Sequence, residues 1–193
     1  MLVVSDTTPI LTILKMNRLS ILQDLFGEII IPQAVWDELV QNDRYYEETI
    51  IIKKSNFIKV EQVDNEELVN TLCERNRRLH KGESEAIVLC LDKDADILLM
   101  DENEGRNEAK LNGVRKVMGS IGIFALAIDN DLLSENSSKL LVQQLKSSDR
   151  WIKPDLINFL DDVISAKFMS KNTLSRKHKT ADSEHNKHSI GGR

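Results

Sequence analysis

Short apolar runs rich in β-branched residues alternate with segments of helical periodicity from the N-terminus to about residue 118, and this alternation constrains the fold most strongly. The runs predicted to be strands are Leu2–Ser5, Glu28–Ile31, Phe57–Val60, Ile97–Met100 and a weaker one at Arg115–Met118. Strands that alternate with helices are joined by crossover connections, which place helices on both faces of a parallel sheet. The predicted fold class is therefore α/β, with a parallel sheet of about four to five strands.

The C-terminal third carries helical patterns only, at Ser137–Lys146 and Pro154–Ala166. From residue 170 the chain loses apolar residues and holds six Lys or Arg against two Asp or Glu, a local charge of +4. Such a composition is typical of a disordered segment, because it cannot bury enough apolar surface to fold. We predict one domain over residues 1–169, including the C-terminal helices, and a disordered basic tail over residues 170–193.

Charge and composition limit the classes of function. The net charge is −5, so subtracting the tail leaves about −9 on the body. An acidic body does not bind nucleic acid by bulk charge, and a nucleic-acid role would require local basic patches or bound metal ions. No apolar run is long enough to span a bilayer, and the N-terminus lacks the basic start of a signal peptide. Cys73 and Cys90 fall in helix-like apolar patterns, which indicates reduced core residues and a cytoplasmic location.

Acidic residues stand where predicted strands end. Asp6 follows the first strand, and Asp101 and Glu102 follow the fourth. Ligands of an open α/β sheet bind beyond the carboxyl ends of its strands, and the first turns of helices point into the same crevice. Glu83 and Glu85 lie in such a first turn. We therefore expect several of these carboxylates to approach one another.

Converging carboxylates repel each other unless a cation lies between them. Oxygen ligands without His or Cys favour Mg²⁺ or Mn²⁺, and these ions typically serve phosphodiester hydrolysis. Each acid alone has a simpler explanation. Asp6 is placed to cap a helix, and Glu83 or Glu85 to complement a helix dipole. Glu38 is equally suited to a solvated helix face. Their order along one α/β pattern is what favours a joint site.

Five motifs in this order resemble those of PIN-domain proteins, over about residues 1 to 165. They are Val3-Val4-Ser5-Asp6-Thr7-Thr8-Pro9-Ile10, Ile30-Ile31-Pro32 with Val35-Trp36-Asp37-Glu38-Leu39, Gly82-Glu83-Ser84-Glu85-Ala86-Ile87, Leu98-Leu99-Met100-Asp101-Glu102 with Gly105-Arg106 and Ala109, and Gly119-Ser120-Ile121-Gly122. The form of the third and fourth motifs is similar to that of a poorly characterised branch, itself similar to the toxin ribonucleases of VapBC toxin–antitoxin pairs.

The resemblance implies a three-layer α/β/α fold and an endoribonuclease that cleaves single-stranded RNA with one or two Mg²⁺ or Mn²⁺ ions. Carried over by motif, the catalytic and metal-binding residues would be Asp6, Glu38, Glu85 and Asp101. Glu83 and Glu85 lie about 200° apart around a helix, so we expect one of them to face the cleft. We favour Glu85, as the third helical residue before Ala86-Ile87. Glu102 would replace Asp101 if the turn were shifted by one residue.

The resemblance also implies partners. They are an RNA substrate and a cognate antitoxin protein, and a homodimer is compatible with the helical extension. A basic run from Arg75 to Lys81 precedes the third motif and is suited either to an RNA backbone or to a solvated helix end. Two other functions remain open: a non-catalytic PIN-like scaffold that binds no divalent ion, and a metallonuclease directed at DNA.

Overall fold

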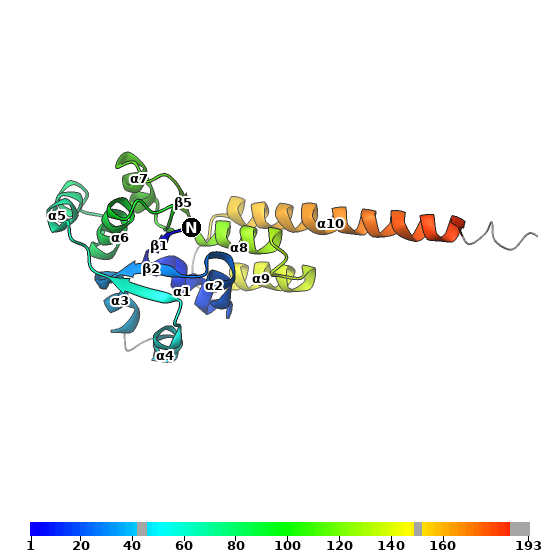
Figure 1. The fold of residues 1–193 in the computed structure, drawn as a ribbon, viewed down its shortest axis with the longest axis horizontal. Helices are drawn as coiled ribbons and strands as arrows, with labels where there is room; N and C mark the ends of the chain where they lie inside the picture. The colour runs from blue at the N-terminus through cyan, green and yellow to red at the C-terminus, as the bar shows by residue number, and fades with distance from the viewer. Residues whose placement is uncertain (42–45, 149–151, 186–193) are drawn as a thin grey trace, which may run out of the picture. The chain divides into compact units, whose positions relative to one another are not determined.

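The computed structural model describes residues 1–41, 46–148 and 152–185 (Figure 1). Contacts within the chain define two compact units, Met1–Leu126 and Ala127–Arg193. The first unit contains the whole sheet and every site residue that the sequence predicts, so the candidate site lies within this unit.

The first unit is built on a five-stranded parallel sheet in the order β3-β2-β1-β4-β5. The strands are β1 (Val3–Ser5), β2 (Ile29–Pro32), β3 (Ile58–Glu61), β4 (Ile97–Leu99) and β5 (Val117–Met118). The prediction of an α/β fold with a parallel sheet is confirmed. Strand order runs outward in one direction from β1 to β3 and in the other from β4 to β5. The switch between β1 and β4 is where an open α/β sheet forms its ligand crevice.

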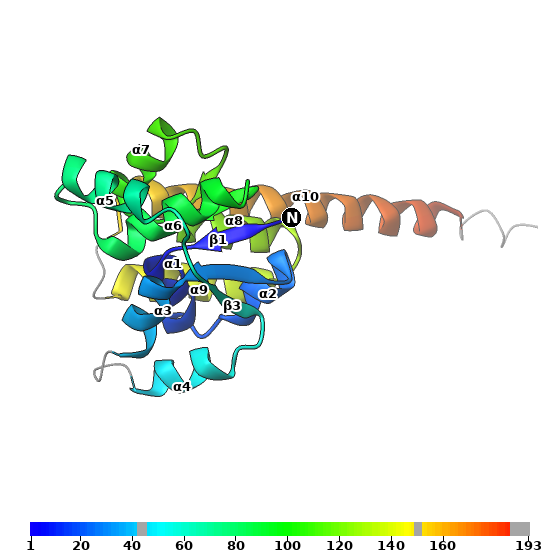
Figure 2. The ribbon, with the colours of Figure 1, turned by 60° about the vertical axis from the view of Figure 1, so that its left-hand side comes forward.

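Helices cover both faces of this sheet. They are α1 (Thr7–Lys15), α2 (Ser20–Phe26), α3 (Gln33–Val40), α4 (Tyr46–Lys54), α5 (Glu66–Arg75), α6 (Lys81–Asp92), α7 (Asn103–Leu111) and α8 (Ser120–Asp129), the last crossing the unit boundary. In Figure 2, α5, α6 and α7 lie on one side of the sheet and α1 and α2 on the other. Alternate strand residues such as Val4, Ile30 and Leu98 pack into one apolar core with Leu72 of α5 and Ile87 of α6. Burial of this apolar surface fixes the sheet against α6.

Two helix starts differ from the sequence prediction. Helix α6 begins at Lys81, whereas the pattern placed its start at Glu83, and α8 begins at Ser120, whereas the pattern placed a turn through Gly122. Glycine lowers helix propensity by about 1 kcal/mol, which tertiary packing readily overrides. Since a helix turns by about 100° per residue, a start displaced by two residues changes which side chains face the site.

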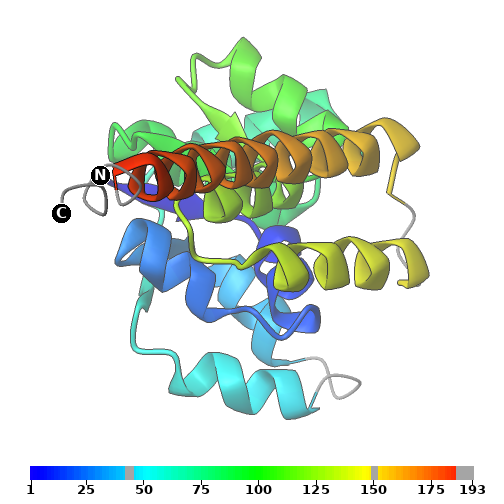
Figure 3. The same cartoon turned by 90° about the vertical axis from the view of Figure 1, so that its right-hand side faces the viewer.

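The second unit pairs α9 (Glu135–Ser147) with α10 (Pro154–His185), which lie side by side in Figure 3. Leu141 and Leu145 of α9 and Ile157 and Leu160 of α10 are buried. Helix α10 continues to His185, so the predicted tail is helical where it is described, and residues 186–193 lie outside the described residues. The Ala, Lys and Arg of this segment are good helix formers. The domain boundary at residue 169 stays a prediction. No described helix combines the length and apolar character that a membrane crossing requires.

Candidate metal-binding site at the sheet switch point

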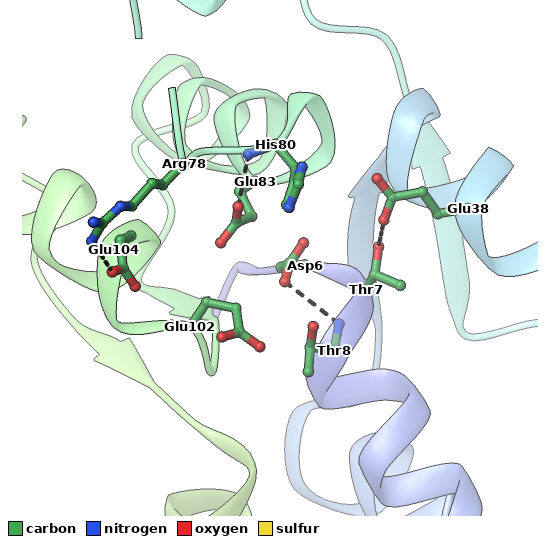
Figure 4. Close-up of a pocket in the computed structure, with 9 residues that line it drawn as sticks. All are labelled: Asp6, Thr7, Thr8, Glu38, Arg78, His80, Glu83, Glu102 and Glu104. Carbon is green, nitrogen blue, oxygen red and sulfur yellow. Dashed lines mark hydrogen bonds and ion pairs between the residues drawn. The ribbon is translucent and has the colours of Figure 1, made fainter. Parts of the chain in front are cut away.

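A cavity of about 390 Å³ opens at the carboxyl ends of β1 and β4. The Asp6 backbone N–H donates to the Leu99 carbonyl at 2.9 Å, which ties the ends of the two strands together. The residues that line the cavity are Asp6, Thr7, Thr8, Glu38, Arg78, His80, Glu83, Glu102 and Glu104 (Figure 4). They come from segments far apart in the sequence, and the sheet topology brings them together.

Asp6 is a buried acid of this cavity. It directly precedes α1, accepts a long hydrogen bond from the Thr8 backbone N–H at 3.5 Å, and is only 2 % exposed. Burial, helped by the negative charges of Glu83 and Glu38, raises the pKa of Asp6 from 3.8 to about 7, although the backbone hydrogen bonds from Thr7 and Thr8 oppose this rise. A carboxyl group in this position gains strongly from a nearby cation.

Glu83 is the second buried acid and the third residue of α6. Its Oε2 accepts a hydrogen bond from the His80 backbone N–H at 2.8 Å, whereas its Oε1 is buried and has no hydrogen-bond partner. Burial raises the pKa of Glu83, although the His80 hydrogen bond opposes this rise. A Cβ at Gly105 would lie 2.9 Å from Oε1 and 2.4 Å from Met100 Sδ, so the glycine leaves room for both side chains. An unsatisfied buried carboxylate oxygen is costly and requires an explanation.

Three more acids line the cavity: Glu38, Glu102 and Glu104, the last of which pairs with Arg78. Glu38 comes from α3 and accepts a hydrogen bond from the Thr7 hydroxyl, with 2.5 Å between Thr7 Oγ1 and Glu38 Oε2. Glu102 immediately precedes α7, and its charge raises the pKa of Glu83. Figure 4 shows the four carboxylates of Asp6, Glu38, Glu83 and Glu102 around one space. Asp6 and Glu38 are the two predicted site residues that the structure brings together here.

Glu85 and Asp101, the other two predicted site residues, do not line the cavity. Glu85 Oε2 accepts a hydrogen bond from the Ala34 backbone N–H at 3.0 Å, and Glu85 Oε1 pairs with Lys81 Nζ at 3.4 Å. Asp101 accepts hydrogen bonds from the Ser120 backbone N–H at 2.7 Å and from the Ser120 hydroxyl at 2.5 Å. Glu83 and Glu102, the alternatives in the same two motifs, occupy the cavity in their place.

The position of the α6 start explains the first of these differences. The sequence argument favoured the acid at the third helical position, and it assigned this position to Glu85 on the expectation of a start at Glu83. With the start at Lys81, the third position belongs to Glu83. The second difference has the same origin, because β4 ends at Leu99 rather than Met100 and the following turn is shifted by one residue.

The sequence predicts Arg78 and His80 only as part of a basic run suited either to an RNA backbone or to a solvated helix end, and it gives no role to Glu104. Arg78 was part of the noted basic run, and His80 was the one histidine outside the tail. Arg78 Nη1 lies 3.4 Å from Glu104 Oε1, and its side chain is 81 % exposed. An exposed ion pair of this kind contributes little to stability, so Arg78 is available to other anions. The proximity of the basic run to the third motif was the only signal for these residues.

Comparison with known proteins decides the family. A sequence model of the PIN domain matches residues 2–164. The chain belongs to the PIN-domain family. The search of curated proteins and the search of solved structures both returned no significant match. The family match covers the sheet and every residue that lines the cavity, which confirms the PIN-domain resemblance and gives the chain the general fold of a nuclease.

PIN domains usually use Mg²⁺ or Mn²⁺, which poses the question whether this cavity suits such an ion. As the side chains stand, no three His, Cys, Asp or Glu of the described residues are gathered closely enough to hold a metal. The chemistry of the lining nevertheless fits. Its acids supply oxygen donors only, Asp6 is buried with a raised pKa, and Glu83 Oε1 has no partner. Glu38 and Glu102 are exposed, so their side chains are not held in place by packing.

Proposed function

We propose that this PIN-domain protein is a metal-dependent endoribonuclease that hydrolyses phosphodiester bonds of single-stranded RNA. The observation that carries the proposal is Glu83, whose buried Oε1 has no hydrogen-bond partner and whose side chain lines the cavity together with four other acids. A carboxylate whose burial is not compensated within the protein is typical of a site that receives a cation. The resemblance to toxin ribonucleases supports RNA as the substrate.

Asp6 and Glu83 would hold the ion. Glu38, from α3, and Glu102, from the turn before α7, would supply the remaining protein oxygens. When bound, Mg²⁺ or Mn²⁺ would screen the phosphate, activate a water molecule and stabilise the leaving oxygen. Asp6 needs no movement for this role, because its place at the end of β1 already directs it into the cavity. In this proposal Glu83 and Glu102 take the roles that the motifs predict for Glu85 and Asp101.

The remaining lining residues would act on the substrate and on the acids. The Thr7 hydroxyl orients Glu38 by its hydrogen bond. Arg78 and His80 present N–H donors at the same cavity and would contact phosphate oxygens of the RNA. An overall acidic chain with few such contacts is better suited to a short single-stranded segment than to a long duplex.

The family resemblance also suggests a cellular role for the protein. We propose that the protein acts in the cytoplasm as the toxin of a toxin–antitoxin pair, with a short antitoxin protein as its partner. Both described cysteines are free, as expected in a reducing compartment. A small reading frame next to this one that encodes a DNA-binding protein would support the pairing.

Calorimetric titration with Mn²⁺ and a cleavage assay on mixed single-stranded RNA test the function together. The samples are the wild type, Asp6→Asn, and Asp24→Asn as a control at an exposed acid of α2. We expect Mn²⁺ binding and RNA cleavage in the wild type and in Asp24→Asn, and neither in Asp6→Asn. Cleavage of single-stranded DNA alone would redirect the proposal to a DNA nuclease. A wild type that binds no Mn²⁺ would contradict catalysis and indicate a PIN-like scaffold.

A further inference from the structure

The two predicted acids that do not line the cavity have one feature in common. Glu85 and Asp101 each accept a hydrogen bond from the first turn of another helix, α3 in one case and α8 in the other. Each stands beside an acid that does line the cavity, Glu83 in the third motif and Glu102 in the fourth. The two motifs therefore contain one acid directed at the cavity and one directed at a helix N-terminus.

Helix α3 cannot cap itself. It is preceded by Pro32, which has no side-chain oxygen, and the structure shows no side-chain cap from this residue. The free N–H groups of a first helical turn need acceptors, normally a Ser, Thr, Asp or Asn at the cap position. Glu85 Oε2 takes this place by accepting from Ala34, the second residue of α3, at 3.0 Å. A carboxylate from α6 thus replaces the missing cap.

Helix α8 has the same deficiency. The residue before its first turn is Gly119, which has no side chain. Asp101 accepts from both the backbone N–H and the hydroxyl of Ser120, at 2.7 and 2.5 Å. A Cβ at Gly119 would lie 2.8 Å from Asp101 Oδ1, so the absence of a side chain is what admits the carboxylate.

Each of the two caps helps to position an acid that lines the cavity, Glu38 in one case and Glu102 in the other. Helix α3 carries Glu38, so the bond from Glu85 to Ala34 fixes the helix that delivers Glu38 to the cavity. Asp101 is the neighbour of Glu102, and its two bonds to Ser120 fix the turn from which Glu102 projects. Arg106 Nη1 donates to the Met100 carbonyl at 2.8 Å and holds the same turn from α7.

We infer that Glu85 and Asp101 are positioning residues, which cap α3 and α8 from outside these helices and thereby place Glu38 and Glu102, and that they do not bind the metal. This inference rests on the proposed function insofar as it concerns the metal. Within each motif, the acid that accepts a hydrogen bond from another helix is a positioning residue, and the acid that lines the cavity is a metal ligand.

Conservative substitutions distinguish a cap from a ligand. In Glu85→Gln and Asp101→Asn an amide oxygen remains to accept the backbone N–H, whereas the negative charge is lost. We expect Mn²⁺ affinity, measured by calorimetry, to stay within about threefold of the wild type, because a cap needs an acceptor rather than a charge. The matched variant Glu83→Gln should lose at least about tenfold, since it removes charge from the ligand set.

Thermal unfolding without metal provides the second readout. Glu85→Ala removes the cap and should lower Tm by roughly 2–4 °C, whereas Glu85→Gln should restore most of this loss. Loss of Mn²⁺ affinity in Glu85→Gln equal to that in Glu83→Gln would overturn the inference, as would equal Tm values for Glu85→Ala and the wild type. A wild type that binds no Mn²⁺ would overturn the proposed function instead, and the unfolding series would still decide whether Glu85 is a cap.

Discussion

Glu83 and Glu108 are equally buried glutamates of the first unit, each 5 % exposed, yet their surroundings differ. Glu108, on α7, forms an ion pair with Arg75 of α5 and accepts a hydrogen bond from Asn112 Nδ2 at 3.0 Å. Glu83, on α6, accepts one hydrogen bond from a backbone N–H, and its second oxygen has no partner. Glu108 therefore has a structural role, since it connects α5 to α7.

The difference shows which property of a buried acid indicates function. Burial alone does not, because a buried carboxylate with a cationic partner is a common structural element. What distinguishes Glu83 is a buried oxygen without a partner, beside Asp6, whose pKa burial raises to about 7. This cost falls at the carboxyl end of the sheet, where ligands of an open α/β sheet bind.

The largest expected effect separates the two glutamates directly. Glu83→Gln should lower the rate of RNA cleavage in Mn²⁺ by at least about a hundredfold, because a metal ligand contributes several kcal/mol to the transition state. Glu108→Gln should leave the rate within about threefold at temperatures where the variant is folded. Single-turnover cleavage assays with circular dichroism as a folding control measure both. Equal losses in the two variants would remove the distinction.

The second prediction concerns Asp6, the buried acid beside Glu83, and the pH dependence of the free energy of unfolding. Because the pKa of Asp6 is 3.8 in its unperturbed state and about 7 in the fold, the folded protein holds this proton more tightly between these values. The free energy of unfolding of the metal-free wild type should therefore fall as pH rises from about 4 to about 7, by a term of order 3 kcal/mol from this group. Asp6→Asn should lack that term. Urea unfolding at several pH values measures the difference, and parallel pH profiles for the two proteins would contradict it.

A third prediction concerns the paired glutamate. Arg75→Ala leaves Glu108 buried without its cation and should lower the free energy of unfolding by about 1–3 kcal/mol. Arg77→Ala is a control at an exposed neighbour in the same basic run and should change it by less than about 0.5 kcal/mol. Denaturant unfolding measures both changes. Equal stability of the two variants would show that the Arg75 pair does not support Glu108.

The smallest effect is expected at Thr7. Thr7→Val removes the hydroxyl that donates to Glu38 and should weaken Mn²⁺ binding by about fivefold, the equivalent of one hydrogen bond of about 1 kcal/mol. Thr7→Ser keeps the hydroxyl and should bind as the wild type does. Calorimetric titration tests the pair. Unchanged affinity in Thr7→Val would mean that Glu38 needs no orientation by this residue.

The sequence allowed the parallel sheet and Asp6 to be predicted, because both follow from local patterns. Apolar runs identify the strands, and an acid directly after the first strand lies at the carboxyl end of the sheet, where ligands bind. The structure places Glu83 rather than Glu85 at this cavity, and the sequence could not decide between them because the choice depends on a helix start known only to about two residues. Glu104 was not predicted and His80 was predicted only as part of a basic run, since only the tertiary fold brings them to the cavity of Asp6.

A crystal structure of the wild type grown with MnCl₂ tests the central claim most directly, since anomalous scattering locates Mn²⁺ independently of activity. We predict an anomalous peak in the cavity between Asp6 and Glu83, with Glu83 Oε1 among the oxygens that contact the ion. A peak coordinated by Glu85 or Asp101, or a cavity without a peak at a saturating Mn²⁺ concentration, would contradict the account.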